Sequence, residues 1–140
     1  MGKIDFKEFI RALKRSHRKQ VFGRLFAVDA ETKEVCGCAL GQGLLEIGIV
    51  SEEEIKTALL SRGVMASRKV YDPVTQKTQL RNVLEDASYE TQFGSLLDSL
   101  NQQSPNGQFT GDVITANDGK ELPIPNILEK FWNKWLPNGL

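Results

Sequence analysis

The sequence has little of what metal centres and nucleophilic sites are made from. Its 140 residues include two cysteines, Cys36 and Cys38, and one histidine, His17. A disulfide framework needs more cysteines, and a Cys-Gly-Cys bridge would close a ring with poor geometry. A thiolate-rich metal site usually takes four ligands, and a catalytic cysteine needs a positioned base. We therefore expect reduced thiols packed in the core and no metal or cofactor. Binding without catalysis is favoured, and a hydrolase or transferase stays open as a third alternative.

Long apolar runs are lacking as well. No run approaches the roughly 20 residues that span a bilayer, and the polar start of the chain, Met1–Asp5, is unlike a secretory signal. The sequence predicts a cytoplasmic protein with no membrane partner. Its length fits a single domain, which we place at 1–140, and 40% hydrophobic residues is an ordinary globular composition.

Net charge is absent too, but the charges are unevenly distributed. The whole chain balances 18 Lys/Arg against 18 Asp/Glu. Residues 1–24 hold eight of the basic and two of the acidic residues, which leaves ten against sixteen for the rest of the chain. Segregated charge creates a field that attracts an anion or an acidic surface.

The basic segment is the main candidate for a binding site. No acidic residue interrupts positions 9–28, and arginine clusters bind phosphates through bidentate hydrogen bonds. The alternative is that the segment is a solvated face, as most charge runs are. The near-neutral isoelectric point of the chain is unlike the basic value of a nucleic-acid-binding domain, which disfavours a nucleic acid as the partner. The candidate ligand-binding residues of this segment are Arg11, Lys14, Arg15, Arg18, Lys19 and Arg24.

Apolar spacing predicts an α+β fold that is mostly helical, with one or two short β-hairpins. Apolar residues at helical spacing predict a helix over 4–15, and alternation ahead of a turn at 29–32 predicts a hairpin over 20–35. Small and apolar residues predict a buried helix over 36–47, ended by Gly48. Residues 64–79 are ambiguous and suggest a second turn or hairpin. Further helices are expected at 51–61, 80–87, 89–102 and after Pro123 and Pro125.

Two short motifs, Cys36-Gly37-Cys38-Ala39-Leu40-Gly41 and Thr115–Gly119, resemble a loose family of small uncharacterised proteins of bacteriophages and prophages. Those proteins carry a Cys-Cys-Leu-Gly-like helix and a C-terminal Asn-Asp pair. Gly37 departs from the tandem cysteine of the family. The likeness covers roughly residues 8–132 and implies a phage source and a similar order of elements. It also implies that the Asn-Asp turn packs near the helix at 36–45, and it implies no catalytic residue.

Asn117 and Asp118 are further candidates for ligand binding, because an exposed carboxamide and carboxylate can hydrogen-bond a ligand. The alternative is a turn, since Asn-Asp-Gly is a common turn sequence.

The predicted function is binding without catalysis. The partner is expected to be an anionic, nucleotide-like small molecule that the protein sequesters, or an acidic surface of a host protein that it masks. The phage resemblance alone implies an accessory factor of the host cytoplasm, for instance in counter-defence. The alternative function is a nucleic-acid-associated regulator that uses the same basic segment. A homo-oligomer is a further expectation, because Glu46 and Glu52–Glu54 offer an acidic face to a second copy.

Overall fold

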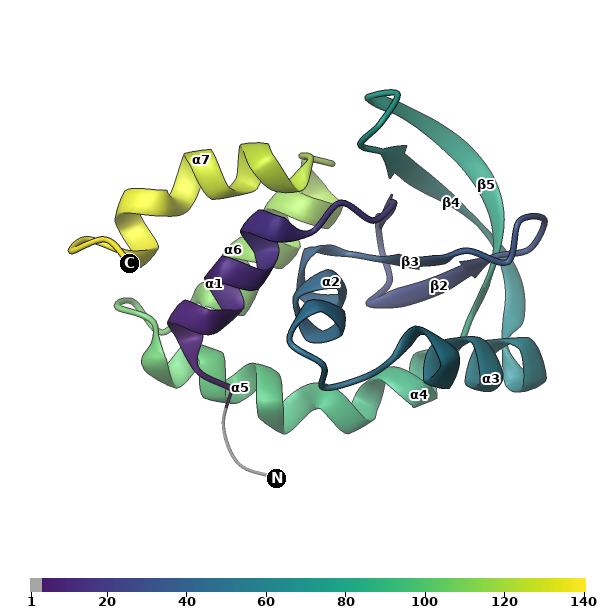
Figure 1. Cartoon of the computed structure of the whole chain (residues 1–140), viewed down its shortest axis with the longest axis horizontal. Helices are drawn as coiled ribbons and strands as arrows, with labels where there is room; N and C mark the ends of the chain where they lie inside the picture. Colours follow the sequence, from purple (N-terminus) through teal and green to yellow (C-terminus); the bar gives the residue numbers. More distant parts are fainter. Residues whose placement is uncertain (1–3) are drawn as a thin grey trace.

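Helices pack around one side of a small five-stranded barrel (Figure 1). The computed structural model describes residues 4–140. The fold is mostly helical and of the α+β class, as the sequence predicts. In chain order the elements are α1 (Phe6–Arg15), β1 (Gln20–Val21), β2 (Phe26–Asp29), β3 (Val35–Gly37), α2 (Ala39–Glu46), α3 (Glu52–Arg62), β4 (Val64–Asp72), β5 (Lys77–Glu85), α4 (Ala87–Glu90), a 3₁₀ turn (Thr91–Phe93), α5 (Gly94–Gln103), α6 (Phe109–Ile114), a π-helical turn (Thr115–Gly119) and α7 (Ile124–Trp135).

The strands close in the order β1-β3-β2-β5-β4. β1 runs parallel to β3, and the other neighbouring pairs are antiparallel. The long β4–β5 hairpin pairs from Val64↔Glu85 to Asp72↔Lys77, and its turn projects beyond the rest of the barrel (Figure 1). A small apolar cluster fills the barrel interior: Val21, Ala27, Cys36, Val70 and Val83.

Helix α1 forms and docks as its sequence predicts. The Asp5 carboxylate accepts a hydrogen bond from the N–H of Glu8 at 2.9 Å, which caps the first turn. The apolar side of α1, which includes Phe9, packs on α2. A Cβ at Gly43 of α2 would lie 2.3 Å from the Phe9 ring, so this glycine permits the close approach of the two helices.

Figure 1 shows α2 between the strands and the group formed by α1, α5, α6 and α7. One large core cluster runs through these helices from Ile4 to Leu136. Trp135 is fully buried in it, whereas Trp132 is half-buried. No helix within residues 4–140 has the length and apolar character needed to cross a bilayer.

Several predicted elements are confirmed. Ser51 and Glu54 form a reciprocal capping box at the start of α3, and Gly63 caps its end. The helical stretch expected over 89–102 is present as α4, the 3₁₀ turn and α5. The turn expected at 29–32 joins β2 to β3, and Gly48 follows α2 with a φ of +84°.

Three predictions are wrong in detail. Cys36 and Gly37 belong to β3 and pair with β2, so α2 begins only at Ala39. Residues 80–87 are not a helix: most of them lie in β5, where pairing with β4 outweighs the helical spacing. The first arm of the expected 20–35 hairpin is interrupted between β1 and β2, where Gly23 adopts a φ of +98°.

Candidate functional site

Two hollows of about 540 and 310 Å³ adjoin at the open end of the barrel. They share Lys19, Thr32 and Asp72 as lining residues, and we call them together the barrel-mouth cleft. Its walls come from the segment after α1, the β2–β3 turn, the first turns of α3 and the β4–β5 turn. The mouth of a barrel is a common place for a small-molecule site, because strands from different parts of the chain surround one space.

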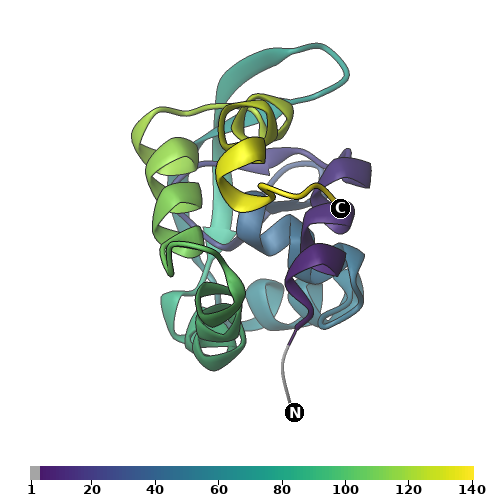
Figure 2. The ribbon, with the colours of Figure 1, turned by 90° about the vertical axis from the view of Figure 1, so that its left-hand side faces the viewer.

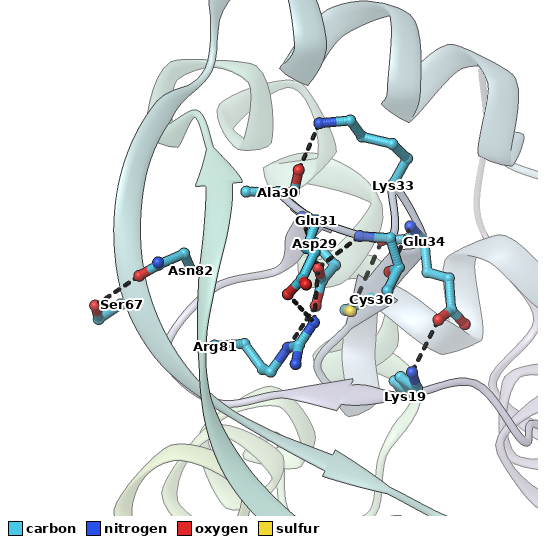
Figure 3. A network of polar contacts seen from close by, with 11 residues as sticks. Lys19, Asp29, Ala30, Glu31, Lys33, Glu34, Cys36, Ser67, Arg81 and Asn82 are labelled. Carbon is cyan, nitrogen blue, oxygen red and sulfur yellow. Dashed lines mark hydrogen bonds and ion pairs between the residues drawn. The ribbon is translucent and has the colours of Figure 1, made fainter.

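An ion pair between Arg81 and Asp29 forms one wall of the cleft (Figure 3). The Arg81 guanidinium donates two hydrogen bonds to the buried carboxylate, at 2.8 and 3.1 Å. The backbone N–H groups of Glu31 and Thr32 each donate to the same carboxylate at 2.9 Å. Desolvation raises the pKa of Asp29, but these donors outweigh it and lower the pKa to about 2. Asp29 therefore organises the β2–β3 turn as an anion and keeps Arg81 in place.

The segment after α1 contributes two more ion pairs. Lys19 contacts Glu34 at 2.8 Å (Figure 3), and Arg18 contacts Glu52 at 3.2 Å. The hydrogen bond that Lys19 donates to Glu34 raises the pKa of the Lys19 ammonium, which therefore stays charged. The buried Nε of Arg18 has no hydrogen-bond partner within the described chain.

Three lysines of the cleft have no carboxylate partner among residues 4–140. Lys33 lies on the β2–β3 turn, where its ammonium donates to the Ala30 carbonyl. Lys56 is on α3, and Lys77 begins β5. The carboxylate left over in the cleft is that of Asp72, which accepts the N–H of Val74. Once the paired ions cancel, the lining carries a positive excess, and an anion is the ligand that such a site attracts.

The predicted basic residues do not form one patch. Arg18 and Lys19 line the barrel-mouth cleft, whereas Arg11, Lys14 and Arg15 lie on α1. Arg11 pairs with Glu8 within the same helix. The guanidinium of Arg15 donates to the Glu46 carbonyl, and Lys14 lies over the Trp132 ring.

Arg24 is directed to a different part of the molecule. Its guanidinium contacts Glu85 at 2.7 Å, and Arg68 holds the same buried carboxylate through two hydrogen bonds of 2.7 and 3.0 Å. The two hydrogen bonds from Arg68, followed by the one from Arg24, lower the pKa of Glu85. This carboxylate between two arginines fastens the β1–β2 loop to the hairpin, which is a structural role.

Asn117 and Asp118 lie in the π-helical turn and bind other parts of the chain. The buried Asn117 side chain accepts from the N–H of Ala39 at 3.1 Å, so this pair does pack against the start of α2, as the resemblance implies. The Asp118 carboxylate accepts from the N–H of Gly23 at 2.8 Å. The described structure brings neither residue into the barrel-mouth cleft.

Sequence reasoning missed four of the cationic residues of the cleft: Lys33, Lys56, Lys77 and Arg81. A signal was present in β5, where Lys77, Gln79 and Arg81 alternate along one face of the hairpin. Because a helix was expected over 80–87, this alternation along β5 was not recognised. The contributions of Lys33 and Lys56 depend on tertiary contacts that the sequence pattern does not encode.

Both cysteines are buried and free. Burial raises the pKa of Cys36 and of Cys38 to about 12, so both thiols are protonated at neutral pH. Within residues 4–140 no three His, Cys, Asp or Glu side chains are grouped so as to hold a metal ion.

Comparison with protein-family models, with curated proteins and with solved structures found no match for the chain. The resemblance to phage proteins therefore stays a prediction.

Proposed function

We propose that the protein binds a small anionic molecule in the barrel-mouth cleft and acts by sequestering it. The observation that carries this proposal is the position of Lys33, Lys56 and Lys77. They come from three separate elements, line one cleft and lack carboxylate partners in the described chain. Arg18 also lines the cleft, but its guanidinium is paired with Glu52.

The size and lining of the cleft favour a compact ligand with more than one anionic group. The two hollows can each receive one such group, with Lys19 between them. Thr32 and Thr75 offer hydroxyl groups, and Val70 supplies an apolar floor. A mononucleotide, with a phosphate and a partly apolar base, fits this combination of charge and surface.

Binding to a nucleic acid is the second candidate, and the lining disfavours it. The carboxylates of Glu34, Glu52 and Asp72 lie among the lysines, and they would repel a phosphate backbone that runs across the cleft. Salt dependence separates the two functions. Affinity for a duplex falls steeply with log salt because several counterions are released, whereas affinity for a mononucleotide falls less.

The test is calorimetric titration with a fixed panel: inorganic phosphate, pyrophosphate, AMP, ATP and a 16-base-pair DNA duplex. We expect at least one of the four small anions to bind. In the double variant Lys56→Gln/Lys77→Gln its dissociation constant should rise by about tenfold or more, since each lost contact to an anion is worth about 1 kcal/mol.

The matched control is Lys7→Gln/Lys130→Gln, which removes two exposed lysines outside the cleft and should leave the affinity within about twofold. Native mass spectrometry of protein purified from its expression host adds a panel-free test, since a retained small anion should be lost from the cleft variant. Equal affinity in both double variants, or binding of the duplex alone, would contradict the proposal.

A phage source and a role in counter-defence are further proposals that depend on the resemblance alone.

A further inference from the structure

A second surface lies between α1 and α7, away from the barrel mouth. Both figures of the whole chain show these helices next to each other (Figures 1 and 2). A groove of about 500 Å³ runs between them. Its apolar lining comes from Leu13 of α1 and from Ile124, Pro125, Leu128 and Trp132 of α7.

Trp132 is the aromatic side chain that lines the groove. It is half-buried, unlike Trp135, which lies in the core on the same helix. The Lys14 ammonium lies 5.2 Å from the centre of the Trp132 ring, a cation–π contact across the rim of the groove. A large aromatic side chain at the edge of an apolar groove is the kind of residue that dominates binding energy at interfaces.

The α1 side of the groove is cationic. Lys7, Arg11 and Lys14 lie at i, i+4 and i+7, which places them in one row along the exposed side of α1. Arg11 is paired with Glu8, whereas Lys7 and Lys14 have no carboxylate partner within residues 4–140. Lys14 is the cation of this row that lines the groove. Glu129 is the carboxylate that lines the groove, and it belongs to α7. Charge is therefore positive on one edge and negative on the other.

We propose that this groove docks an acidic amphipathic helix of a partner protein. The apolar side chains of that helix enter the groove beside Trp132, and its carboxylates face Lys14 on the α1 edge. The lining residues of α7 extend from Ile124 to Asn133, a rise of about 14 Å, or two and a half turns. This length suits a helix that inserts apolar residues at i, i+3, i+4 and i+7.

A second copy of the chain is a poorer occupant. Among residues 4–140, the large exposed apolar side chains that lie on helices are Leu60 of α3 and Ile114 of α6. Each helix thus offers one such residue and no apolar row for the groove. The acidic face that the sequence offers at the start of α3 includes Glu52, which is already paired with Arg18. Charge complementarity therefore favours a different protein.

The test is selection from a displayed library of helical peptides of about 16 residues, long enough to span the groove. Leu, Ile, Phe or Trp occupy the positions at i, i+3, i+4 and i+7, and the other positions vary among Glu, Lys, Gln and Ala. We expect the selected peptides to be enriched in Glu along one edge. Enrichment of Lys or Gln there, or of no sequence, would overturn the proposal.

The selected peptide is then titrated against folded variants, with circular dichroism as the check on folding. Trp132→Ala and Lys14→Glu should each raise its dissociation constant by about tenfold or more. Lys56→Glu, in the barrel-mouth cleft, should leave it within about twofold, which also separates this surface from the proposed ligand site.

Two other occupants are outcomes of the same experiment. Sedimentation equilibrium that shows a dimer lost in Trp132→Ala would assign the groove to a second copy. Co-sedimentation with phosphatidylserine vesicles that is lost in Lys14→Glu would assign it to an anionic membrane. Either result would overturn the acidic helix as the occupant.

Discussion

Gln20 and Asn117 join distant parts of the chain through one buried hydrogen bond, in which Nε2 of Gln20 donates to Oδ1 of Asn117 at 2.7 Å. Gln20 also donates to the Leu122 carbonyl and accepts the N–H of Ile124, both at 2.9 Å. Asn117 additionally donates to the Val21 carbonyl. The two side chains therefore fasten β1 to the connection before α7, and every polar atom of the pair is satisfied.

Replacing Asn117 by alanine should destabilise the protein by about 3 kcal/mol, because several buried partners lose their hydrogen bonds at once. Urea denaturation at pH 7 measures the free energy of unfolding. The matched control is Asn126→Ala, on an exposed position of α7, which should change that energy by less than about 0.5 kcal/mol. Similar losses in the two variants would show that the buried network contributes little.

Asp29 should make stability depend on pH in acid. Its pKa of about 2 in the folded protein lies below its usual value of 3.8. A lowered folded pKa stabilises the fold above the unfolded pKa, and that stabilisation is lost as the pH falls from about 4 to about 2. The expected contribution at neutral pH is about 2 kcal/mol.

The variant Asp29→Asn tests this dependence. Its free energy of unfolding should lie below that of the wild type at pH 6, and the difference should shrink as the pH approaches 2. Denaturation curves at pH 2, 3, 4 and 6 measure it. A constant difference over this range would contradict an ionised, Arg81-bound Asp29.

Gly41 is required by a close backbone contact. A Cβ at this position would lie 2.1 Å from the Leu25 carbonyl oxygen, a backbone atom that cannot turn aside. Gly41→Ala should therefore cost about 3 kcal/mol or more. In contrast, a Cβ at Gly94 meets nothing within 4 Å, and Gly94→Ala should stabilise α5 by about 0.5 to 1 kcal/mol. Thermal and urea denaturation of both variants should show opposite signs, and equal effects would contradict the packing.

The sequence predicts helix ends best where a local signal marks them. Ser51 and Glu54 form the expected capping box, and Gly63 ends α3. It predicts strands poorly where pairing decides the conformation. Residues after Leu80 have helical spacing, yet β5 is held by β4 along its whole length. Leu80 is exposed on that hairpin, so counting it as part of a buried apolar face led to the wrong prediction of a helix.

The candidate site illustrates the same limit. Arg18 and Lys19 were visible as part of a basic run, because charge composition is local information. The sequence around a cation does not show whether a carboxylate will neutralise it in the folded protein. Lys19 is matched by Glu34 and Arg18 by Glu52, whereas Lys56 and Lys77 are isolated members of mixed sequences. The carboxylate partners that cancel one set of charges are brought close only by the fold.

The two cysteines should be unreactive while the protein is folded. Burial raises the pKa of each thiol to about 12, and the thiolate is the form that iodoacetamide attacks. At pH 8 we expect no carbamidomethylation over several hours in buffer, and modification of both residues once urea unfolds the chain, as measured by intact-mass spectrometry. Cys36 lies in the small barrel core with Val70 and Val83, and Cys38 lies in the main core. Unequal labelling at intermediate urea would therefore show that the barrel opens separately from the helical core, whereas fast labelling in buffer would contradict the burial of both thiols.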